Sequence, residues 1–488
     1  VFLPLLKDGK DPTKTSAYRP VAITSLLCRV FEKVLSNRLQ PTVERLRDSQ
    51  CGFRRHHGVE DAIGHVLHKV ESAGALPPRH VRDGDTDLGT LQCSTLVAAV
   101  DMTDAFCRIR RRDVVTALTR LGAPAEITQF VSEWMSERTA QVWLDGGLGE
   151  MFDLAAGAPQ GSILAPLLFV FVADSLAGVI EAAIEHELDA PTRKRHPGLS
   201  ASYVAYADDL TIIVSGHSLP VAQRLIARLL AAVHSWCAAH NIAVSAKTKI
   251  SVMTKSTRLA AAEFDEITIG NLKIRPTVEP VRICGLVIDP RRAFSAHVDE
   301  LEKTCRPLLE DLEVAAVFLH PAATRQLYTG TVLARILFAS EFYFHRMAPT
   351  TQQRLEALHA RGCRAITRAT ATAAAADCIA EAGFLPVSFY ATKRAINLRC
   401  SKLQHAIARP WLRPIVNPHF EPRPRVLEVP TIDETDDGTW RRHVKYVTTP
   451  PAPSSASTDA KRRANIARLA DYSPDNDVSC FTDGSVKQ

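Results

Sequence analysis

The chain has 488 residues, of which 46% are hydrophobic and 23% are charged, a composition typical of a globular protein with several structural units. Lys and Arg outnumber Asp and Glu by 59 to 53, and the net charge of +6 favours a polyanionic partner. The longest apolar run near the middle, 163–173, is about half the ~20 residues that cross a bilayer, so we expect no membrane role. The eleven cysteines form no C-x-x-C pair, which argues against zinc and favours free thiols in a reducing compartment.

The N-terminal half alternates between helical and β-type periodicity. In chain order, the pattern predicts a helix over 26–39, a strand over 96–100, a helix over 112–121 and an amphipathic helix over 221–240. Two polar, turn-rich segments, 77–90 and 189–200, are predicted to be surface loops or insertions. We therefore expect an α+β sheet with helices on one face.

The tetrapeptide Tyr206-Ala207-Asp208-Asp209 lies between two apolar, β-prone stretches, which predicts a hairpin with two aspartates at its tip. Adjacent carboxylates repel each other unless a cation lies between them. Hard divalent cations, Mg²⁺ above all, meet this need with oxygen ligands, so the turn is a candidate metal site. Taken alone, the same residues also fit an ordinary Asp-Asp turn.

Asp101 ends a predicted strand 107 residues before Asp208, a separation that allows the chain to return and place the two strands side by side. Three aspartates around two metal ions are what two-metal phosphoryl transfer requires. The alternative is that Asp101 caps the helix that follows. Between these sites, a Gly- and Pro-containing loop at 157–162 precedes an apolar helix, and its backbone could approach a substrate closely. Such loops are also common without a ligand.

The C-terminal part changes character. From 298 to about 409 the pattern is almost wholly helical, with segments near 298–318, 322–345, 351–369 and 388–408 and a helix-compatible Ala/Thr tract at 369–376. Fifteen Lys or Arg against eight Asp or Glu between Leu301 and Arg413 give this region a positive surplus, which suits a nucleic-acid partner. Pro-rich sequence at 411–430 and 448–458 predicts a linker.

Three blocks, in this order, resemble the core motifs of reverse transcriptases: Asp101-x-x-Asp104-Ala105-Phe106, Pro159-Gln160-Gly161-Ser162 and Tyr206-Ala207-Asp208-Asp209. Upstream, 18–25 (YRPVAITS) and 50–54 (QCGFR) resemble the finger blocks of the non-LTR (LINE-type) retrotransposon branch. Downstream, 246–248 (AKT) and 284–285 (CG) resemble its lysine and primer-grip blocks.

The resemblance implies a right-hand polymerase. Fingers and a palm with an antiparallel sheet would occupy 1–290, a helical thumb and connection 291–410, and a linker 411–475. The activity would be RNA-directed DNA polymerisation, in which dNTPs are added to a primer 3′-hydroxyl on an RNA template. As a retroelement ribonucleoprotein, the protein is expected in the nucleus and cytoplasm.

The resemblance also assigns roles to single residues. Asp101, Asp208 and Asp209 would hold Mg²⁺, with Mn²⁺ as a substitute. Phe106 would lie beneath the sugar of the incoming dNTP, where it would clash with a ribose 2′-hydroxyl. Plain core packing is the alternative for this ring.

Six further residues would bind the substrate. Gln160, Gly161 and Tyr206 would line the nucleotide site, Arg19 and Arg54 would face the triphosphate from the fingers, and Lys247 would lie near the leaving pyrophosphate. Arginine forks suit phosphate geometry and lysine acts as a point charge. The alternative for each cation is a solvated surface charge.

Near the end, Phe481-Thr482-Asp483-Gly484-Ser485 resembles the first strand of an RNase H domain, whose leading metal-binding aspartate would be Asp483. Because the sequence begins with Val1 and stops five residues after this aspartate, we expect a fragment at both ends, with 476–488 as a truncated RNase H start. The rival interpretation is a catalytically inactive or domesticated remnant that only binds nucleic acid.

Overall fold

The structure is a computed structural model that describes residues 1–404 except 8, 10, 84–85, 104, 145, 155 and 255–263. The chain divides into two compact units, one from Val1 to Glu300 and one that begins at Leu301. The division lies inside a long helix, α10 (Ser295–Phe318), whereas the sequence places the boundary at residue 290. The predicted linker and RNase H start, with Asp483, lie outside the described residues.

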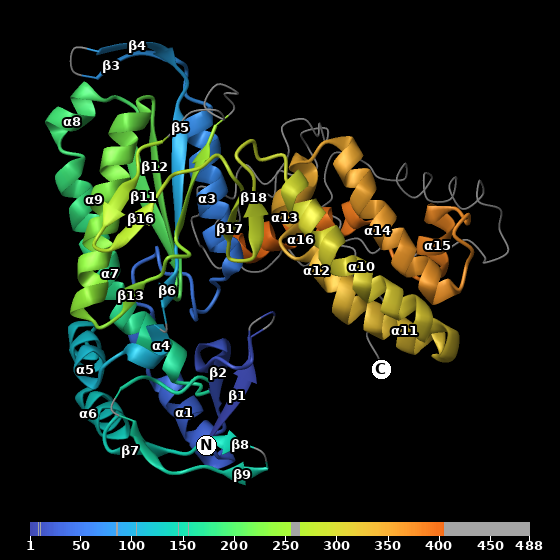
Figure 1. The fold of residues 1–488 in the computed structure, drawn as a ribbon, viewed down its shortest axis with the longest axis horizontal. Coiled ribbons are helices and arrows are strands. Elements are labelled where there is room, and N and C mark those ends of the chain that lie inside the picture. Colours follow the sequence, from blue (N-terminus) through green and yellow to red (C-terminus); the bar gives the residue numbers. More distant parts are fainter. Residues whose placement is uncertain are drawn as a thin grey trace, which may run out of the picture. The chain divides into compact units, whose positions relative to one another are not determined.

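A four-stranded antiparallel sheet forms the centre of the first unit (Figure 1). Its strand order is β11 (Ser200–Tyr206), β12 (Asp209–Gly216), β5 (Ser94–Val100) and β14 (Lys249–Met253). The predicted hairpin is confirmed, since Tyr206 pairs with Asp209 across the turn. The predicted strand at 96–100 is confirmed as well, and it lies directly beside β12.

Helices cover both faces of this sheet, so the expectation of helices on one face is wrong (Figure 1). The helices α7 (Ala165–Glu187) and α9 (Leu219–Ala239) lie on one side, and α3 (Val59–Gly74) lies on the other. The reason is visible in β12, whose residues from Leu210 to Gly216 are all buried, whichever face of the sheet they belong to. A strand that is apolar on both faces needs a cover on each.

The helix α7 is the central helix of this unit. By length and composition alone it would suffice to cross a membrane, but Leu168, Phe169, Val170 and Phe171 are fully buried in the protein core. It packs against α9 and against α5 (Arg111–Arg120), the helix predicted over 112–121. Its hydrophobicity on all sides therefore reflects burial by the surrounding helices.

Several shorter elements complete the first unit. Two-stranded antiparallel ribbons form between β1 (Phe2–Leu6) and β2 (Tyr18–Ala22), β6 (Met102–Thr103) and β13 (Ala243–Val244), β7 (Arg138–Ala140) and β10 (Phe152–Leu154), β8 (Trp143–Leu144) and β9 (Gly147–Leu148), β15 (Ile267–Ile269) and β16 (Leu272–Ile274), and β17 (Val281–Ile283) and β18 (Leu286–Ile288). The remaining helices are α1 (Leu26–Arg38), α2 (Gln40–Val43), α4 (Ala105–Arg108), α6 (Ala125–Trp134), α8 (Ala190–Arg195) and a 3₁₀ turn (Thr15–Ala17).

Two segments predicted to be loops carry regular structure. Residues 77–90 contain most of a hairpin, β3 (Arg79–Asp83) and β4 (Thr86–Leu91), with a register shift after Val81. Residues 189–200 contain α8, whose N-terminus is capped by the side chain of Asp189. Both segments are polar because they are exposed, and hydrophobic periodicity is weak evidence for short exposed elements.

The second unit is helical, as predicted. Its helices are α10, α11 (Pro321–Tyr328), a π-helical turn (Thr329–Leu333), α12 (Ala334–Leu337), α13 (Ser340–Tyr343), a 3₁₀ turn (Phe344–Arg346), α14 (Pro349–Thr367), α15 (Ala375–Glu381) and α16 (Val387–Gln404). The single helix expected over 322–345 is broken at Ala339, which has a left-handed φ of +55°. The Ala/Thr tract becomes helical only from Ala375, because Arg368 ends α14 in a left-handed conformation.

Candidate active site

The sheet brings two of the three predicted metal-binding aspartates opposite each other. Val100, the last residue of β5, pairs with Leu210, so Asp101 directly after it comes next to Asp209, the first residue of β12, and both line one cavity. Asp208 precedes Asp209 in the turn of the β11–β12 hairpin. Main-chain bonds also hold Asp101, because its N–H donates to the Thr248 hydroxyl at 3.2 Å and its carbonyl accepts from Ser245 at 2.7 Å.

A segment from far upstream in the chain fixes the aspartate turn. The side-chain oxygen of Gln50 accepts hydrogen bonds from the N–H groups of Ala207 and Gly52, both at 2.9 Å. The neighbouring Cys51 N–H donates to the carbonyl of Ala205 at 2.8 Å. Gln50 is only 2% exposed, and no motif in the sequence assigns it this role. Its place within the QCGFR block is the signal that pointed to the segment.

Glycine is required at Gly52, because a Cβ there would lie 2.5 Å from the main-chain nitrogen of Ala207. The 50–53 segment therefore packs its backbone directly against the aspartate turn, and a side chain would push the two apart. This close approach explains the glycine of the QCGFR block.

The charges in the turn repel one another. Burial, followed by the negative charges of Asp209 and Asp101, raises the pKa of Asp208 to about 6. Burial and the charge of Asp101 also raise the pKa of Asp209. The turn at Cys284, the predicted primer grip, lies close enough that both aspartates, after burial, raise the pKa of its thiol to about 12.

The oxygen atoms of Asp101, Asp208 and Asp209 are the type of ligand that a hard divalent cation prefers. Three carboxylates that repel one another are also stabilised by a cation between them. Within the described residues, no three His, Cys, Asp or Glu side chains stand close enough together to hold one ion. The convergence of all three carboxylates on shared metal ions therefore stays a prediction.

A cavity of about 800 Å³ opens beside the aspartates, and it collects most of the predicted substrate-binding residues. Its lining includes Asp101, Asp208, Arg19, Phe106, Gln160 and Lys247, contributed by segments spread over more than 200 residues of sequence. A second cavity of about 460 Å³ contains Asp209 together with Asp101, Lys247 and Arg282. Asp101 and Lys247 line both cavities.

Phe106 has a core side and a cavity side. Its ring centroid lies 4.7 Å from that of the buried Phe169 in α7, and the same residue lines the cavity. The ring is half-buried. Core packing and the predicted sugar-facing role are therefore compatible in one side chain.

The loop that carries Gln160 is anchored on two sides. The carbonyl of Gln160 accepts from Ala22 N–H at 2.6 Å, and Ala158 N–H donates to the carbonyl of Phe106 at 2.9 Å. Gly161 has a φ of +111°, and a Cβ there would lie 2.6 Å from the Ala22 carbonyl oxygen. The glycine is thus needed for the close approach that holds Gln160 at the cavity.

Two charged residues, one half-buried and one fully buried, support this region, and no motif singled them out. Arg138 donates to the carbonyl of Gly157 at 2.6 Å, and the carboxylate of Glu32, fully buried, accepts from Ile163 N–H at 2.7 Å. Both act on the two ends of the Gln160 loop. Only the three-dimensional structure reveals these contacts, because Glu32 lies 131 residues from its partner in the sequence.

Arg54 and Tyr206 do not line either of these cavities. The Arg54 guanidinium donates to the carbonyls of Arg47 and Gln50, at 2.8 and 3.1 Å, and its side chain is 8% exposed. In this arrangement it stabilises the 47–54 loop. Tyr206 lies beside Phe53, with ring centroids 6.3 Å apart, and burial, followed by the neighbouring Cys284 and Glu60, raises the pKa of Tyr206.

Comparison with known proteins identifies the family. A family model described as reverse transcriptase (RNA-dependent DNA polymerase) matches residues 7–288, more than half of the chain. The chain belongs to the reverse transcriptase family. The right-hand polymerase fold expected from the motifs is therefore confirmed, with the β11–β12–β5–β14 sheet as its palm.

Among curated relatives, the RNA-directed DNA polymerase from mobile element jockey of Drosophila melanogaster is 24% identical over 304 residues, 62% of this reverse transcriptase and 30% of the relative. The putative 115 kDa protein in type-1 retrotransposable element R1DM of the same species is 26% identical, over 75% of this chain and 32% of that protein. These relatives confirm the predicted non-LTR branch. The chain spans about a third of the length of the curated relatives it matches.

Among solved structures, telomerase from Candida albicans, determined with a fragment of telomeric RNA, matches with a TM-score of 0.35 and 11% identity. The match covers 79% of this reverse transcriptase and 65% of that chain.

Proposed function

We propose that this chain is the polymerase part of a non-LTR retrotransposon protein, which extends a primer 3′-hydroxyl with dNTPs on an RNA template. The observation that carries the proposal is the register of β5 and β12, which brings Asp101 beside the Asp208-Asp209 turn, so that Asp101 and Asp208 line a cavity large enough for a nucleotide. Membership of the reverse transcriptase family supports the same reaction.

The residues around the cavity suit the parts of a dNTP. Arg19 and Lys247 line it and supply positive charge for the triphosphate and the leaving pyrophosphate. Phe106 presents its ring toward the sugar and excludes a 2′-hydroxyl, while Gln160 offers a donor and an acceptor from an anchored loop. These groups position the substrate, and positioning supplies much of the rate in phosphoryl transfer.

Asp101, Asp208 and Asp209 are the residues that would hold Mg²⁺, or Mn²⁺. When bound, such ions supply Lewis acidity that activates the attacking hydroxyl and neutralises the leaving group. The protein's own contribution is to hold the carboxylates in place against their repulsion. Gln50 does this for the turn of Asp208, and Thr248 and Ser245 do it for the backbone of Asp101.

Primer extension tests the proposal. We expect the purified chain to extend a DNA primer on poly(rA) with dTTP in the presence of Mg²⁺ or Mn²⁺, and Asp209→Asn to abolish extension. Asp153→Asn, which removes a charge from the exposed strand β10, is the matched control and should retain full activity.

The rival proposal is a remnant that binds nucleic acid without extending a primer. It is favoured by one observation, that no three metal-ligating side chains in the described residues stand within reach of a single ion. Binding of primer–template by the unaltered chain, with no extension under either metal, would establish this rival and refute polymerase activity.

A further inference from the structure

A second polar pocket lies at the opposite end of the central sheet from the aspartates. Gly216, the last residue of β12, lines it, whereas Asp209 begins the same strand. Eight residues of extended chain place the two ends roughly 23 Å apart. The other walls come from the β3–β4 hairpin and from the segment between α8 and β11, the two segments whose structure the sequence did not predict.

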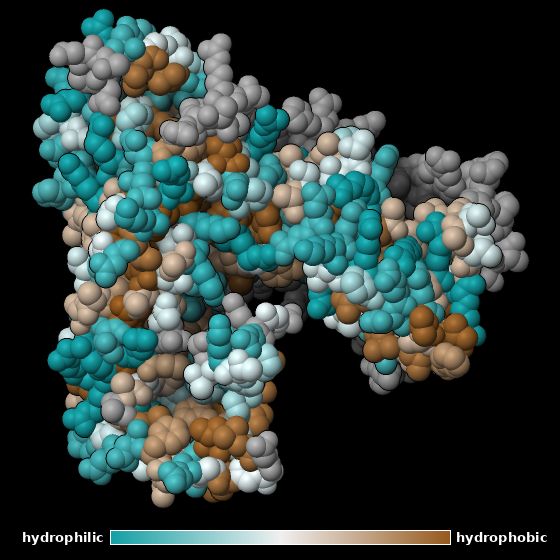
Figure 2. Space-filling view, in the orientation of Figure 1, coloured by the Kyte–Doolittle hydropathy of each residue, from teal (hydrophilic) through white to brown (hydrophobic). Residues whose placement is uncertain are grey.

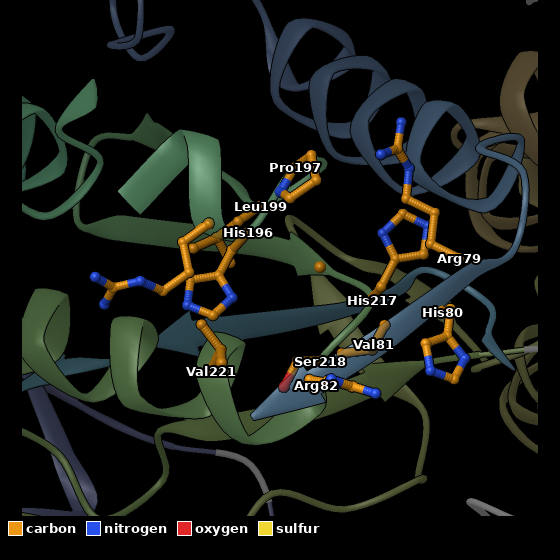
Figure 3. Close-up of a pocket in the computed structure, with 12 residues that line it drawn as sticks. Arg79, His80, Val81, Arg82, His196, Pro197, Leu199, His217, Ser218 and Val221 are labelled. Carbon is orange, nitrogen blue, oxygen red and sulfur yellow. The ribbon is translucent and has the colours of Figure 1, made fainter. Parts of the chain in front are cut away.

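The lining of this pocket is cationic. Arg79 and Arg82 come from β3 and Arg195 from α8, and three histidines are added to them. None of the lining residues is a carboxylate. Figure 3 shows the labelled residues around the pocket, with His196, Leu199 and Val221 on one side, Arg79, His80 and His217 on the other, and Ser218 and Arg82 between them.

Two buried polar atoms in the pocket have no hydrogen-bond partner. The Oγ of Ser218 and the Nδ1 of His217 are both unsatisfied, in residues that are 5% and 7% exposed. Buried polar groups without partners cost free energy, and an unseen ligand is one explanation for such atoms. His217 donates from Nε2 to the carbonyl of Pro77 at 3.0 Å, so Nδ1 is the ring nitrogen that is left without a partner.

The backbone adds to the positive field. Ser218 is the N-cap residue of α9, a helix of 21 residues, and its side chain makes no capping bond. Val221, in the first turn, lines the pocket. The N-terminus of a helix carries a partial positive charge and suits an anion, here beside a hydroxyl that is unused.

The size of the pocket limits the ligand. Its volume is about 70 Å³, well below the ~300 Å³ at the lower end of sites for drug-sized molecules. This small size suits a compact group such as a tetrahedral oxyanion better than a whole nucleotide. Two carboxylates lie near these cations without lining the pocket, and they compete with an anion for the positive charge. Asp87 lies 3.1 Å from His80, and Asp189 lies near Arg195.

We propose that this pocket binds a phosphate group of a nucleic-acid backbone, at a site separate from the catalytic cavity. Arg79, Arg82 and Arg195 supply the charge, and the hydroxyl of the buried Ser218, which has no hydrogen-bond partner, supplies a donor. Phosphate contacts of this kind fix the position of a strand without reading its sequence. The site would anchor RNA or DNA at the far end of the palm from the point of synthesis.

The test measures binding, so it is independent of primer extension. A labelled 30-nucleotide RNA is titrated with the full chain by fluorescence anisotropy at several salt concentrations, and inorganic phosphate is titrated by calorimetry at constant ionic strength. Two variants alter the pocket. The first combines Arg79→Gln with Arg195→Gln, and the second is Ser218→Ala, a substitution that leaves the net charge unchanged. The control is Lys69→Gln with Lys194→Gln, which removes the same charge from exposed positions outside the pocket.

We expect the double variant to weaken RNA binding about tenfold and to lower the salt slope by about 0.7, the value for one phosphate contact on a single strand. Ser218→Ala should weaken binding about fivefold, and the control should leave it nearly unchanged. If phosphate binding falls but RNA affinity does not, the ligand is free phosphate or a nucleotide phosphate, and the backbone assignment is overturned. Equal effects of the pocket and control variants in both titrations would refute the phosphate site altogether.

Discussion

The side-chain oxygen of Gln50 accepts the N–H of Ala207 at 2.9 Å, and this bond holds the turn from which Asp208 projects. Ala207 has a φ of +56°, a left-handed conformation that costs a residue with a side chain about 1 kcal/mol. A buried hydrogen bond from a distant segment offsets that cost. The aspartate turn therefore depends on the 50–53 segment as much as on its own sequence.

Gln50→Leu should lower both stability and activity. The substitution leaves the N–H groups of Ala207 and Gly52 without their acceptor, which should cost about 2–3 kcal/mol in the free energy of unfolding. Urea unfolding measures that cost, and primer extension should fall at least tenfold because the aspartate turn loses its support. Gln129→Leu, an exposed residue of α6 bonded to Glu133, is the control. Equal effects of the two substitutions would contradict the proposed anchoring role.

Asp208→Asn should abolish primer extension and stabilise the metal-free protein. The pKa of Asp208 is raised to about 6, above its ordinary value of 3.8, so folding favours the protonated form. The resulting stabilisation is present below pH 4 and is lost as the pH rises through 6. At pH 7.5, removal of the charge should therefore add about 2 kcal/mol after allowance for solvent screening.

Thermal melts in EDTA and in 5 mM Mg²⁺ test whether Asp208→Asn raises or lowers the stability of the protein. The unaltered protein should gain stability on addition of Mg²⁺, and Asp208→Asn should gain much less, because a ligand that binds only the folded state stabilises it. A variant that is less stable than the parent in EDTA would show that the charge of Asp208 does not destabilise the folded, metal-free protein.

Phe106→Val should admit ribonucleotides. The smaller side chain leaves space beneath the sugar, so the preference for dNTPs over NTPs, measured as a ratio of kcat/KM, should fall by tenfold or more. Phe106 also packs on Phe169, so some loss of stability is expected as well. Phe169→Leu should show a loss of stability with unchanged discrimination. If both variants keep full discrimination, Phe106 has only a packing role.

Gly161→Ala should separate Gln160 from the cavity. A Cβ at this residue meets the Ala22 carbonyl at 2.6 Å, and its φ of +111° disfavours any side chain. We expect a loss of about 1–3 kcal/mol in stability and a fall in activity of at least tenfold, because the loop must move. Gly330→Ala, at a helical glycine with open space around its Cα, should be neutral or slightly stabilising. Comparable losses in the two variants would point to a general intolerance of alanine.

The stability of the second unit should fall in mild acid. His359 is fully buried, with Nδ1 accepting from the Tyr328 hydroxyl at 2.6 Å and Nε2 donating to the carbonyl of Leu385 at 3.1 Å. Burial lowers the pKa of His359 to about 4, from 6.5. As the pH falls, His359 is therefore protonated in the unfolded chain before it is protonated in the folded one. The free energy of unfolding is highest above pH 6.5 and should fall by about 3 kcal/mol between pH 6.5 and pH 4.

Urea unfolding followed by a probe in the helical unit checks this window. His359→Gln should flatten the pH dependence between 6.5 and 4 while lowering stability at pH 7.5. His186→Gln, at an exposed residue of α7, should leave the pH profile unchanged. An unchanged slope in His359→Gln would assign the acid sensitivity to other groups.

Local pattern predicted most of the elements that build the palm. The strand before Asp101, the aspartate hairpin and the helix α9, with Leu225, Leu229 and Val233 buried along one face, all follow from hydrophobic periodicity. The hairpin β3–β4 and the helix α8 were not predictable in this way. Both elements are exposed and polar, so their sequences lack the hydrophobic periodicity that predicts buried elements. The same two segments contribute to the lining of the cationic pocket.

The sequence by itself predicted the candidate metal-binding end, because three blocks in order resemble the core motifs of reverse transcriptases and single out Asp101, Gln160 and Asp208. Only the tertiary structure decided which residues support them. Gln50, Glu32 and Arg138 act through hydrogen bonds to backbone atoms, and a backbone partner leaves no residue type in the sequence to recognise. The structure also places the Arg54 guanidinium on its own loop, where it donates to the carbonyls of Arg47 and Gln50, and backbone acceptors of this kind leave no residue type in the sequence to recognise.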